Sequence, residues 1–184
     1  MLRLVLMCLA VMLLTPAAAT EAGWELLREG GHVVLIRHAM SPGTGDPANF
    51  DINDCSTQRG LSEQGRQQAD RIGTLISVRG AKTQQLLSSR YCRCLDTARF
   101  AFDDREPEIF AALDPLPADP AAAKAQQDEI IARVKSYSGS GNLLMITHKD
   151  VIQALTGVSA HDGEAVIVKA DGDKLRVLGK ILFN

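Results

Sequence analysis

The chain has 184 residues, 46% of them hydrophobic, with 20 basic and 22 acidic residues and a formal net charge of −2 at pH 7. This length is enough for one domain with a full hydrophobic core. The balanced charge excludes a broad basic surface for nucleic acid, so any site that binds an anion must be local.

The N-terminal segment has the layout of a secretory signal peptide. A positive start with Arg3 precedes an apolar run over Leu4–Leu14, and small residues follow up to Ala19. We expect cleavage after Ala19, with residues 1–19 as the signal peptide and residues 20–184 as the mature, secreted or periplasmic domain. The alternative is a membrane anchor, but the run is shorter than the roughly 20 apolar residues that span a bilayer. We therefore expect no stable membrane insertion after cleavage.

The first half of the remaining chain alternates between helix and strand patterns. A short helix is expected over 23–28 and a buried strand over 31–37, "GHVVLIR". A loop rich in Pro, Gly, Asp and Asn follows, from 41 to about 59. Ser62 is a suitable N-cap for a helix that Gly80 ends. "QQLLSS" then predicts a strand, and "YCRCLDTARFAF" predicts the next helix.

The second half continues the alternation. A segment rich in Pro and Asp over 105–120 leads into a helix over 121–138, and "NLLMITH" predicts a strand with a polar end. A short helix over 150–156 precedes a hairpin of two strands around "ADGD". Strands that alternate with helices predict an α/β fold with a mostly parallel central sheet and a single domain.

Polar residues follow three of the predicted strands. They are Arg37-His38, Ser88-Ser89 and Thr147-His148, and Arg93 follows in the first turn of the next helix after Ser89. Because ligands bind at the carboxyl ends of parallel strands, we expect these residues to meet. Two guanidinium groups and a helix N-terminus would hold a tetrahedral dianion. An imidazole among them can attack phosphorus and carry the phosphoryl group, without a metal or a cofactor.

Four blocks of sequence occur in the order typical of one family. They are "LIRHAM", "LSEQGRQQA", "SSRYCRCLDTA" and "LLMITHKD", and they span most of the chain after the signal segment. The chain resembles the histidine phosphatase superfamily, the phosphoglycerate-mutase-like proteins, and is most similar to its small exported members. The resemblance implies a three-layer α/β/α sandwich around a mostly parallel sheet.

The resemblance also implies roles for individual residues. His38 matches the nucleophile of the family, and Arg37 and Arg93 match its phosphate-binding arginines. His148 matches the second histidine, which contacts phosphate and stabilises the transition state. Thr44 stands where larger relatives place a further phosphate contact.

The proton donor is where the chain departs from the family. Larger relatives supply a Glu or Asp between the third and fourth blocks, and that region has no Gly-rich Glu motif here. Asp114 is the nearest candidate, and Asp150 is the alternative. A substrate with a good leaving group, such as a phosphoramidate or an acyl phosphate, would need little help from an acid.

The cysteines after the signal segment are Cys55, Cys92 and Cys94. In an oxidising compartment an odd number suggests one disulfide and one free thiol, and Cys55 can pair with either Cys92 or Cys94. A zinc site is the alternative, although the spacing lacks the usual four ligands.

The sequence thus predicts a metal-independent phosphatase that acts on a small phosphorylated substrate through a phosphohistidine at His38. One alternative is a non-catalytic protein of the same fold that binds phosphate or a phosphorylated ligand. Another is a metal hydrolase using His38 and His148, which the arginines disfavour because they would repel a cation. The substrate and the oligomeric state are left open.

Overall fold

A computed structural model of the chain describes residues 16–103 and 105–183. Most of the predicted signal peptide, residues 1–15, lies outside the described residues. Helix α1 (Pro16–Glu29) runs through the predicted cleavage point and is longer than the helix expected over 23–28. In the part of the chain that the structure describes, no helix is long and apolar enough to cross a membrane.

One six-stranded sheet forms the centre of the molecule, in the order β3-β2-β4-β1-β5-β6. β1 pairs in parallel with β4, as β2 does with β4 and with β3, and β5 runs antiparallel to both β1 and β6. The mostly parallel sheet predicted from the sequence is confirmed. The strands are β1 (Val33–Arg37), β2 (Thr83–Ser88), β3 (Glu108–Ile109), β4 (Asn142–Thr147), β5 (Ala165–Asp171) and β6 (Lys174–Ile181).

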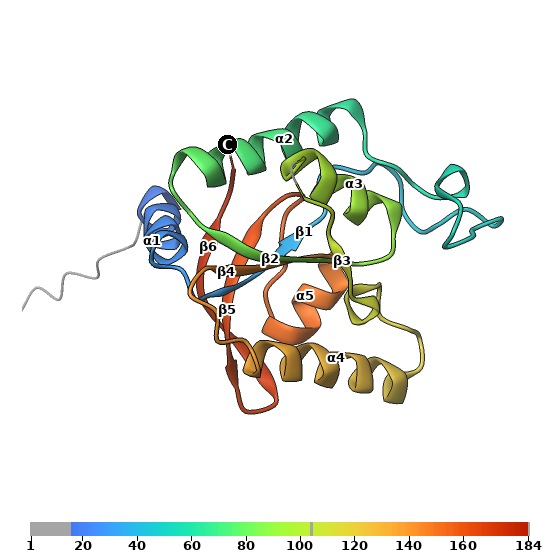
Figure 1. Cartoon of the computed structure of the whole chain (residues 1–184). Helices are drawn as coiled ribbons and strands as arrows, with labels where there is room; N and C mark the ends of the chain where they lie inside the picture. The colour runs from blue at the N-terminus through green and yellow to red at the C-terminus, as the bar shows by residue number, and fades with distance from the viewer. Residues whose placement is uncertain (1–15, 104, 184) are drawn as a thin grey trace, which may run out of the picture.

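Helices cover both faces of the sheet, which gives the three layers expected from the resemblance (Figure 1). α1, α2 and α3 pack on one face and α4 and α5 on the other. The remaining helices are α2 (Glu63–Val78), α3 (Cys92–Ala101), α4 (Pro120–Lys135) and α5 (Lys149–Thr156), with two 3₁₀ turns, η1 (Cys55–Thr57) and η2 (Ala111–Leu113).

The two central strands supply side chains to both cores. Val34 and Ile36 of β1 lie in the core beneath α1, α2 and α3, while Val33 and Leu35 lie in the core beneath α4 and α5. β4 is buried along its whole length in the same alternating way. A strand that is covered on both faces needs an uninterrupted apolar run, which is the pattern that "VVLI" and "LLMI" show.

Local signals explain where α2 begins. The Ser62 hydroxyl accepts a hydrogen bond from Gly65 N at 3.0 Å, so Ser62 is the N-cap of α2 as predicted. A Cβ atom on Gly65 would lie 2.1 Å from the Met40 carbonyl oxygen, which only glycine avoids. α2 therefore begins in direct contact with the segment that follows His38.

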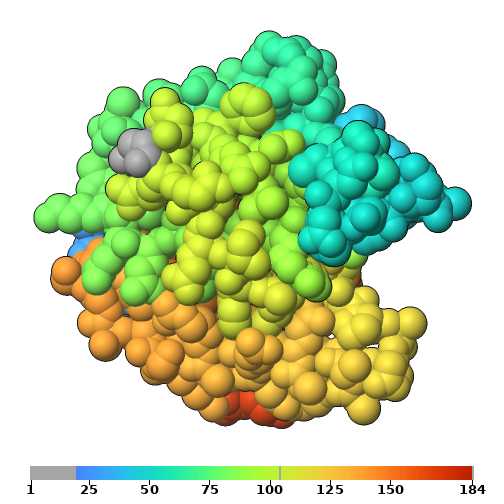
Figure 2. Space-filling view, turned by 45° about the vertical axis from the view of Figure 1, so that its right-hand side comes forward, coloured from blue at the N-terminus to red at the C-terminus, as the bar shows by residue number. Residues whose placement is uncertain are grey.

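The loop over 41–59 stands out from the body of the molecule (Figure 2). Its one short regular element is η1, which the sequence did not predict. The segment over 105–120, expected to be irregular, contains β3 and η2. β3 has only two residues and pairs with the end of β2, so it depends on a tertiary contact rather than on a local pattern.

Candidate active site

Three strand ends meet at one edge of the sheet. Arg37 is aligned with Thr147 in the β1–β4 pair, and the next residue, His38, donates its backbone N–H to the Thr147 carbonyl at 3.0 Å. Ser89, which follows β2, donates its backbone N–H to the Ile146 carbonyl at 3.0 Å. Residues 37–38, 89 and 147–148, which are far apart in the sequence, are therefore adjacent in space, as expected from parallel strand ends.

The His38 imidazole is held in one tautomer. Its Nδ1 lies 2.8 Å from the Ala39 carbonyl oxygen, which can only accept, so Nδ1 carries the proton and Nε2 keeps its lone pair. His38 is 5% exposed, and burial lowers its pKa to about 3, with a further contribution from the Arg93 and Arg37 cations. The ring is therefore neutral at pH 7 and has a free nucleophilic nitrogen.

The His148 ring lies beside it, with a ring-centroid distance of 5.4 Å. His148 immediately precedes α5 and is 3% exposed. Its Nε2 is 3.0 Å from Ser89 Oγ and 3.4 Å from Cys94 Sγ. Burial holds the pKa of His148 well below its usual value, and the nearby Arg93 and His38 lower it further.

Three arginines, not two, line the pocket that contains these histidines. The pocket has a volume of about 360 Å³ and is lined by Arg37, Arg59 and Arg93 together with His38 and His148. In each arginine the Nε–H is buried and has no hydrogen-bond partner among the described residues. Three buried N–H donors around one pocket favour the binding of an oxyanion, because a buried donor without an acceptor is costly.

Two carboxylates partly balance these cations. Asp46 Oδ1 lies 3.0 Å from Arg93 Nη1, and Asp162 Oδ1 lies 2.7 Å from Arg37 Nη2. Arg59 forms no ion pair with a carboxylate of the described residues, and its Nη1 donates to the carbonyl oxygens of residues 41, 42 and 43, at 2.6 to 3.2 Å. The pocket therefore retains a positive character.

Sequence reasoning missed Arg59, Asp46 and Asp162. Arg59 stands two residues before the Leu61 that opens the second sequence block, and this proximity to a family motif was the available signal. Asp46 and Asp162 lie on irregular loops, where no periodic pattern indicates which side chain points inward. Only the packed loops bring them to the arginines.

The two weaker site expectations have different surroundings. Asp114 is 7% exposed and accepts hydrogen bonds from Ser89 Oγ at 2.8 Å, from Arg90 N at 2.8 Å and from Arg90 Nε at 2.7 Å. It does not line the pocket, whereas Asp150 does. Thr44 is exposed, and it is its neighbours Gly45 and Asp46 that line the pocket.

The predicted disulfide is present, and Cys55 pairs with Cys92, with a Cα–Cα distance of 5.7 Å. Cys94 is free and buried, and burial raises the pKa of its thiol above the usual value. The bridge joins the loop that carries Arg59 to the first residue of α3, one position before Arg93. Since two of the three cysteines are bonded to each other, the alternative zinc site is wrong.

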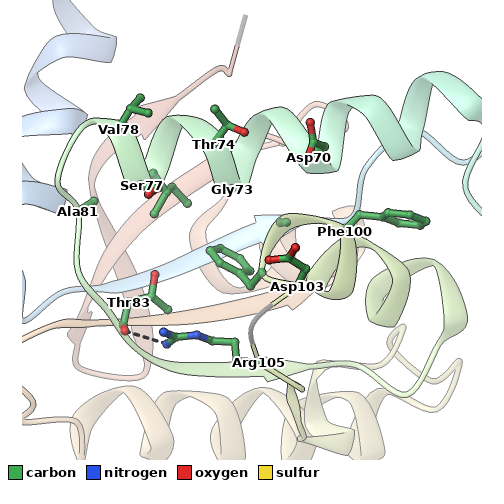
Figure 3. A pocket seen from close by; sticks show the side chains of 13 residues that line it. Asp70, Gly73, Thr74, Ser77, Val78, Ala81, Thr83, Phe100, Asp103 and Arg105 are labelled. Carbon is green, nitrogen blue, oxygen red and sulfur yellow. Dashed lines mark hydrogen bonds between the residues drawn. The ribbon is translucent and has the colours of Figure 1, made fainter.

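No group of three or more His, Cys, Asp or Glu residues suited to a metal ion occurs among residues 16–103 and 105–183. A larger cavity, of about 520 Å³, lies between α2 and the segment around the end of α3 (Figure 3). Among its described lining residues there is no histidine or cysteine, and its Arg105 donates to the Thr83 carbonyl at 2.9 Å. The smaller pocket is therefore the candidate active site.

Comparisons with known proteins agree with this geometry at the level of the fold. No family model and no curated protein matches the chain by sequence. Among solved structures, the protein histidine phosphatase SixA complexed with tungstate is 15% identical with a TM-score of 0.59, covering 83% of this chain and 97% of that one. The alpha-ribazole phosphatase from Shigella flexneri is 18% identical with a TM-score of 0.63, covering 83% of this chain and 96% of that one.

The chain has the histidine phosphatase fold. A mycobacterial glucosyl-3-phosphoglycerate phosphatase, in complex with VO₃, also matches, with 14% identity and a TM-score of 0.59 over 80% of this chain and 97% of that one. The resemblance inferred from four short sequence blocks is thus confirmed for the fold.

Proposed function

We propose that the protein is a phosphatase that hydrolyses a small phosphorylated compound through a phosphohistidine on His38. The observation that carries the proposal is the tautomer of His38. Its Nδ1–H is bound to the Ala39 carbonyl, which leaves the Nε2 lone pair available in a pocket lined by Arg37, Arg59 and Arg93. This arrangement combines a nucleophile with three cations that bind phosphate oxygens.

The proposed reaction has two steps. In the first, His38 Nε2 attacks phosphorus, the P–N bond forms, and the bond to the leaving oxygen or nitrogen breaks with its electron pair. The arginines bind the non-bridging oxygens while charge moves to the leaving group. In the second step, water attacks phosphorus, the P–N bond breaks, and phosphate and neutral His38 are regenerated.

The source of the leaving-group proton bears on the substrate. Asp114, the candidate from the sequence, is hydrogen-bonded to Arg90 and Ser89 and does not line the pocket. The lining carboxylates are Asp46, which is paired with Arg93, and Asp150, whose Oδ2 accepts from Leu116 N at 2.8 Å. Asp114 and Asp46 are both held in ion pairs with arginines, so Asp150 is the lining carboxylate that can still supply a proton. A substrate whose leaving group needs little protonation would not require it.

The test is turnover of p-nitrophenyl phosphate with and without a chelator, by the wild type, His38→Ala and His32→Ala. His32 pairs with Glu29 outside the pocket and is the matched control. We expect chelator-insensitive turnover, a loss of about 10³-fold or more in His38→Ala, and little change in His32→Ala. An alkaline quench, which preserves phosphohistidine, should trap the labelled phosphoryl group on the wild type and on His32→Ala but not on His38→Ala.

Other results would contradict the proposal. Turnover that the chelator abolishes would indicate a metal hydrolase. Binding of vanadate without turnover of any phosphate ester or phosphoramidate would indicate a phosphate-binding protein.

We also propose that the protein is exported and that residues 1–19 are removed. The Cys55–Cys92 disulfide supports an oxidising compartment. Trp24 and Leu27, both buried, would still hold the remaining part of α1 to the sheet after cleavage. N-terminal sequencing of the protein from the periplasm or the medium should begin at Thr20, and recovery with Met1 in place would contradict cleavage.

A further inference from the structure

A chain of hydrogen bonds leads from Asp114 to His148. Ser89 Oγ lies 2.8 Å from Asp114 Oδ1 and 3.0 Å from His148 Nε2. The three residues are 0% (Ser89), 7% (Asp114) and 3% (His148) exposed, and each comes from a different part of the chain. The two reaction steps proposed above do not use these contacts. They nevertheless link the buried Asp114 carboxylate, through the Ser89 hydroxyl, to His148 in the pocket.

The direction of each hydrogen bond follows from the chemistry of the groups. Asp114 also accepts from Arg90 N and Arg90 Nε and forms an ion pair with Arg90 Nη2, so the carboxylate is an acceptor. Ser89 has a single hydroxyl proton, which it donates to Asp114. Its oxygen already accepts from Tyr91 N at 3.2 Å. Towards His148 it can only accept, and His148 Nε2 must therefore carry a proton.

The fixed tautomer limits what His148 can do. With Nε2–H bound to Ser89, Nδ1 is the ring nitrogen left for the pocket, and in a neutral ring it is an acceptor. A neutral His148 would then repel a phosphate oxygen rather than bind it. The ring can donate to an oxyanion through Nδ1 only when it is protonated on both nitrogens.

We propose that Ser89 and Asp114 are positioning residues, which fix His148 as the Nε2–H tautomer and favour its doubly protonated form once a phosphate dianion is bound. The inference rests on the proposed function. It assigns Asp114 to His148 rather than to the leaving group. The proton on Nδ1 then stabilises charge on the phosphoryl oxygens as the transferred group leaves.

The surroundings of His148 explain why this proton should arrive only with the ligand. Burial and the adjacent cations keep the pKa of His148 low in the free protein. A bound dianion would reverse the sign of the local charge and raise the pKa, with Asp114 contributing through Ser89. The titratable and charged groups around His148 among the described residues are Arg37, His38, Asp46, Arg59, Tyr91, Arg93, Cys94, Asp114, Lys149 and Asp150.

The first experiment is the pH dependence of kcat on p-nitrophenyl phosphate for the wild type, Ser89→Ala, Asp114→Asn and Ser88→Ala. Ser88 is the matched control, because it is also fully buried but its hydroxyl donates to the Ser89 carbonyl at 2.9 Å. In the wild-type complex, kcat should fall as the pH rises through the pKa of protonated His148. Ser89→Ala and Asp114→Asn should move this basic limb to lower pH and reduce kcat at pH 7 by about tenfold or more.

A purely structural role would lower activity at all pH values without moving the limb, and that result would overturn the inference. So would an equal displacement of the limb in Ser88→Ala. If the wild type shows no turnover that depends on His38, the proposed function itself fails, which is a different outcome from an unmoved limb.

The second experiment does not depend on active variants. ¹⁵N NMR of histidine-labelled wild-type protein reports the protonation of each ring nitrogen directly. We expect His148 to be protonated on Nε2 alone in the free protein and on both nitrogens with orthovanadate bound. An Nδ1–H tautomer in the free protein, or a neutral ring in the complex, would overturn the inference.

Discussion

At the scale of single residues, the three arginines of the pocket are held in different ways. Arg59 is fixed by three backbone carbonyls, and Arg37 by Asp162 and the Ala160 carbonyl. Arg93 is 3% exposed, lies 4.7 Å over the Tyr91 ring and is paired with Asp46. Because Asp46 occupies the same guanidinium that would bind phosphate, a substrate must compete with it.

The first prediction separates Arg93 from its near neighbour. Arg93 lines the pocket, whereas Arg90 is half exposed and pairs with Asp114. Arg93→Gln should lower kcat/KM for p-nitrophenyl phosphate by about 10²- to 10³-fold, because a donor to the transferred group is lost. Arg90→Gln should have a clearly smaller effect. Equal losses would mean that the two arginines have been assigned in the wrong register.

The second prediction concerns Asp46. Asp46→Asn removes the negative charge that competes for Arg93 and should lower the Kd for orthovanadate by about threefold to tenfold. Asp51→Asn, on the same loop but outside the pocket, is the control. Weaker vanadate binding in Asp46→Asn would show instead that Asp46 holds Arg93 in its binding position.

At the scale of elements, the loop over 41–59 owes its position to a few tertiary bonds. It contains one short 3₁₀ turn, and it is attached to α3 by the Cys55–Cys92 disulfide and by the hydrogen bond from Cys92 N to Gln58 Oε1 at 2.9 Å. The same loop supplies Arg59 and Asp46 to the pocket. The disulfide therefore joins the loop that carries Arg59 to the helix that carries Arg93.

The third prediction follows from this attachment. The bridge closes a loop with a sequence separation of 37, for which chain entropy gives about 3–4 kcal/mol of stabilisation. Reduction with dithiothreitol should lower the melting temperature and weaken vanadate binding. The Cys55→Ala/Cys92→Ala double variant should start at the lower melting temperature and not respond to dithiothreitol. A wild-type melting temperature that reduction leaves unchanged would contradict this role.

At the scale of the whole molecule, two cores on opposite faces of the sheet support one polar edge. The folded protein keeps His38 and His148 buried next to several cations. Protonating either ring there would be unfavourable, because it would place another positive charge in a buried, already cationic site. Stability is thus linked to pH through the same two residues that the proposed reaction uses.

The fourth prediction gives the sign of this linkage. The pKa of His38 is about 3 when folded and that of His148 is well below its usual value, against about 6.5 for an unfolded histidine. Above about pH 6.5 neither the folded nor the unfolded chain binds these protons, so the two histidines do not reduce the free energy of unfolding. Below it the unfolded chain takes up protons that the folded chain does not, so the free energy of unfolding falls by about 1.4 kcal/mol per pH unit and per histidine.

Urea unfolding at pH 7, 6 and 5 measures this slope. The slope of His38→Gln should be smaller than that of the wild type by the contribution of one histidine. A wild-type stability that does not change between pH 7 and 5 would contradict the burial of neutral rings.

Local chemistry explains why much of this protein was predictable. The apolar runs of β1 and β4, the Ser62 cap and the glycine after α2 depend on short-range preferences, so the element types and the mostly parallel sheet followed from the pattern. The meeting of His38 with His148 followed as well, because parallel strand ends share one edge.

The rest depended on contacts between segments far apart in the chain. Whether Cys55 pairs with Cys92 or Cys94, and which loop carboxylates reach the arginines, is set by how an irregular loop packs against α3. Asp114 was noticed for its type and position, but its hydrogen bonds to Ser89 and Arg90 exist only after η2 packs against β4 and α4. Periodic patterns specify which face of an element is buried, whereas the direction of a loop side chain is specified by the partner it finds in the folded protein.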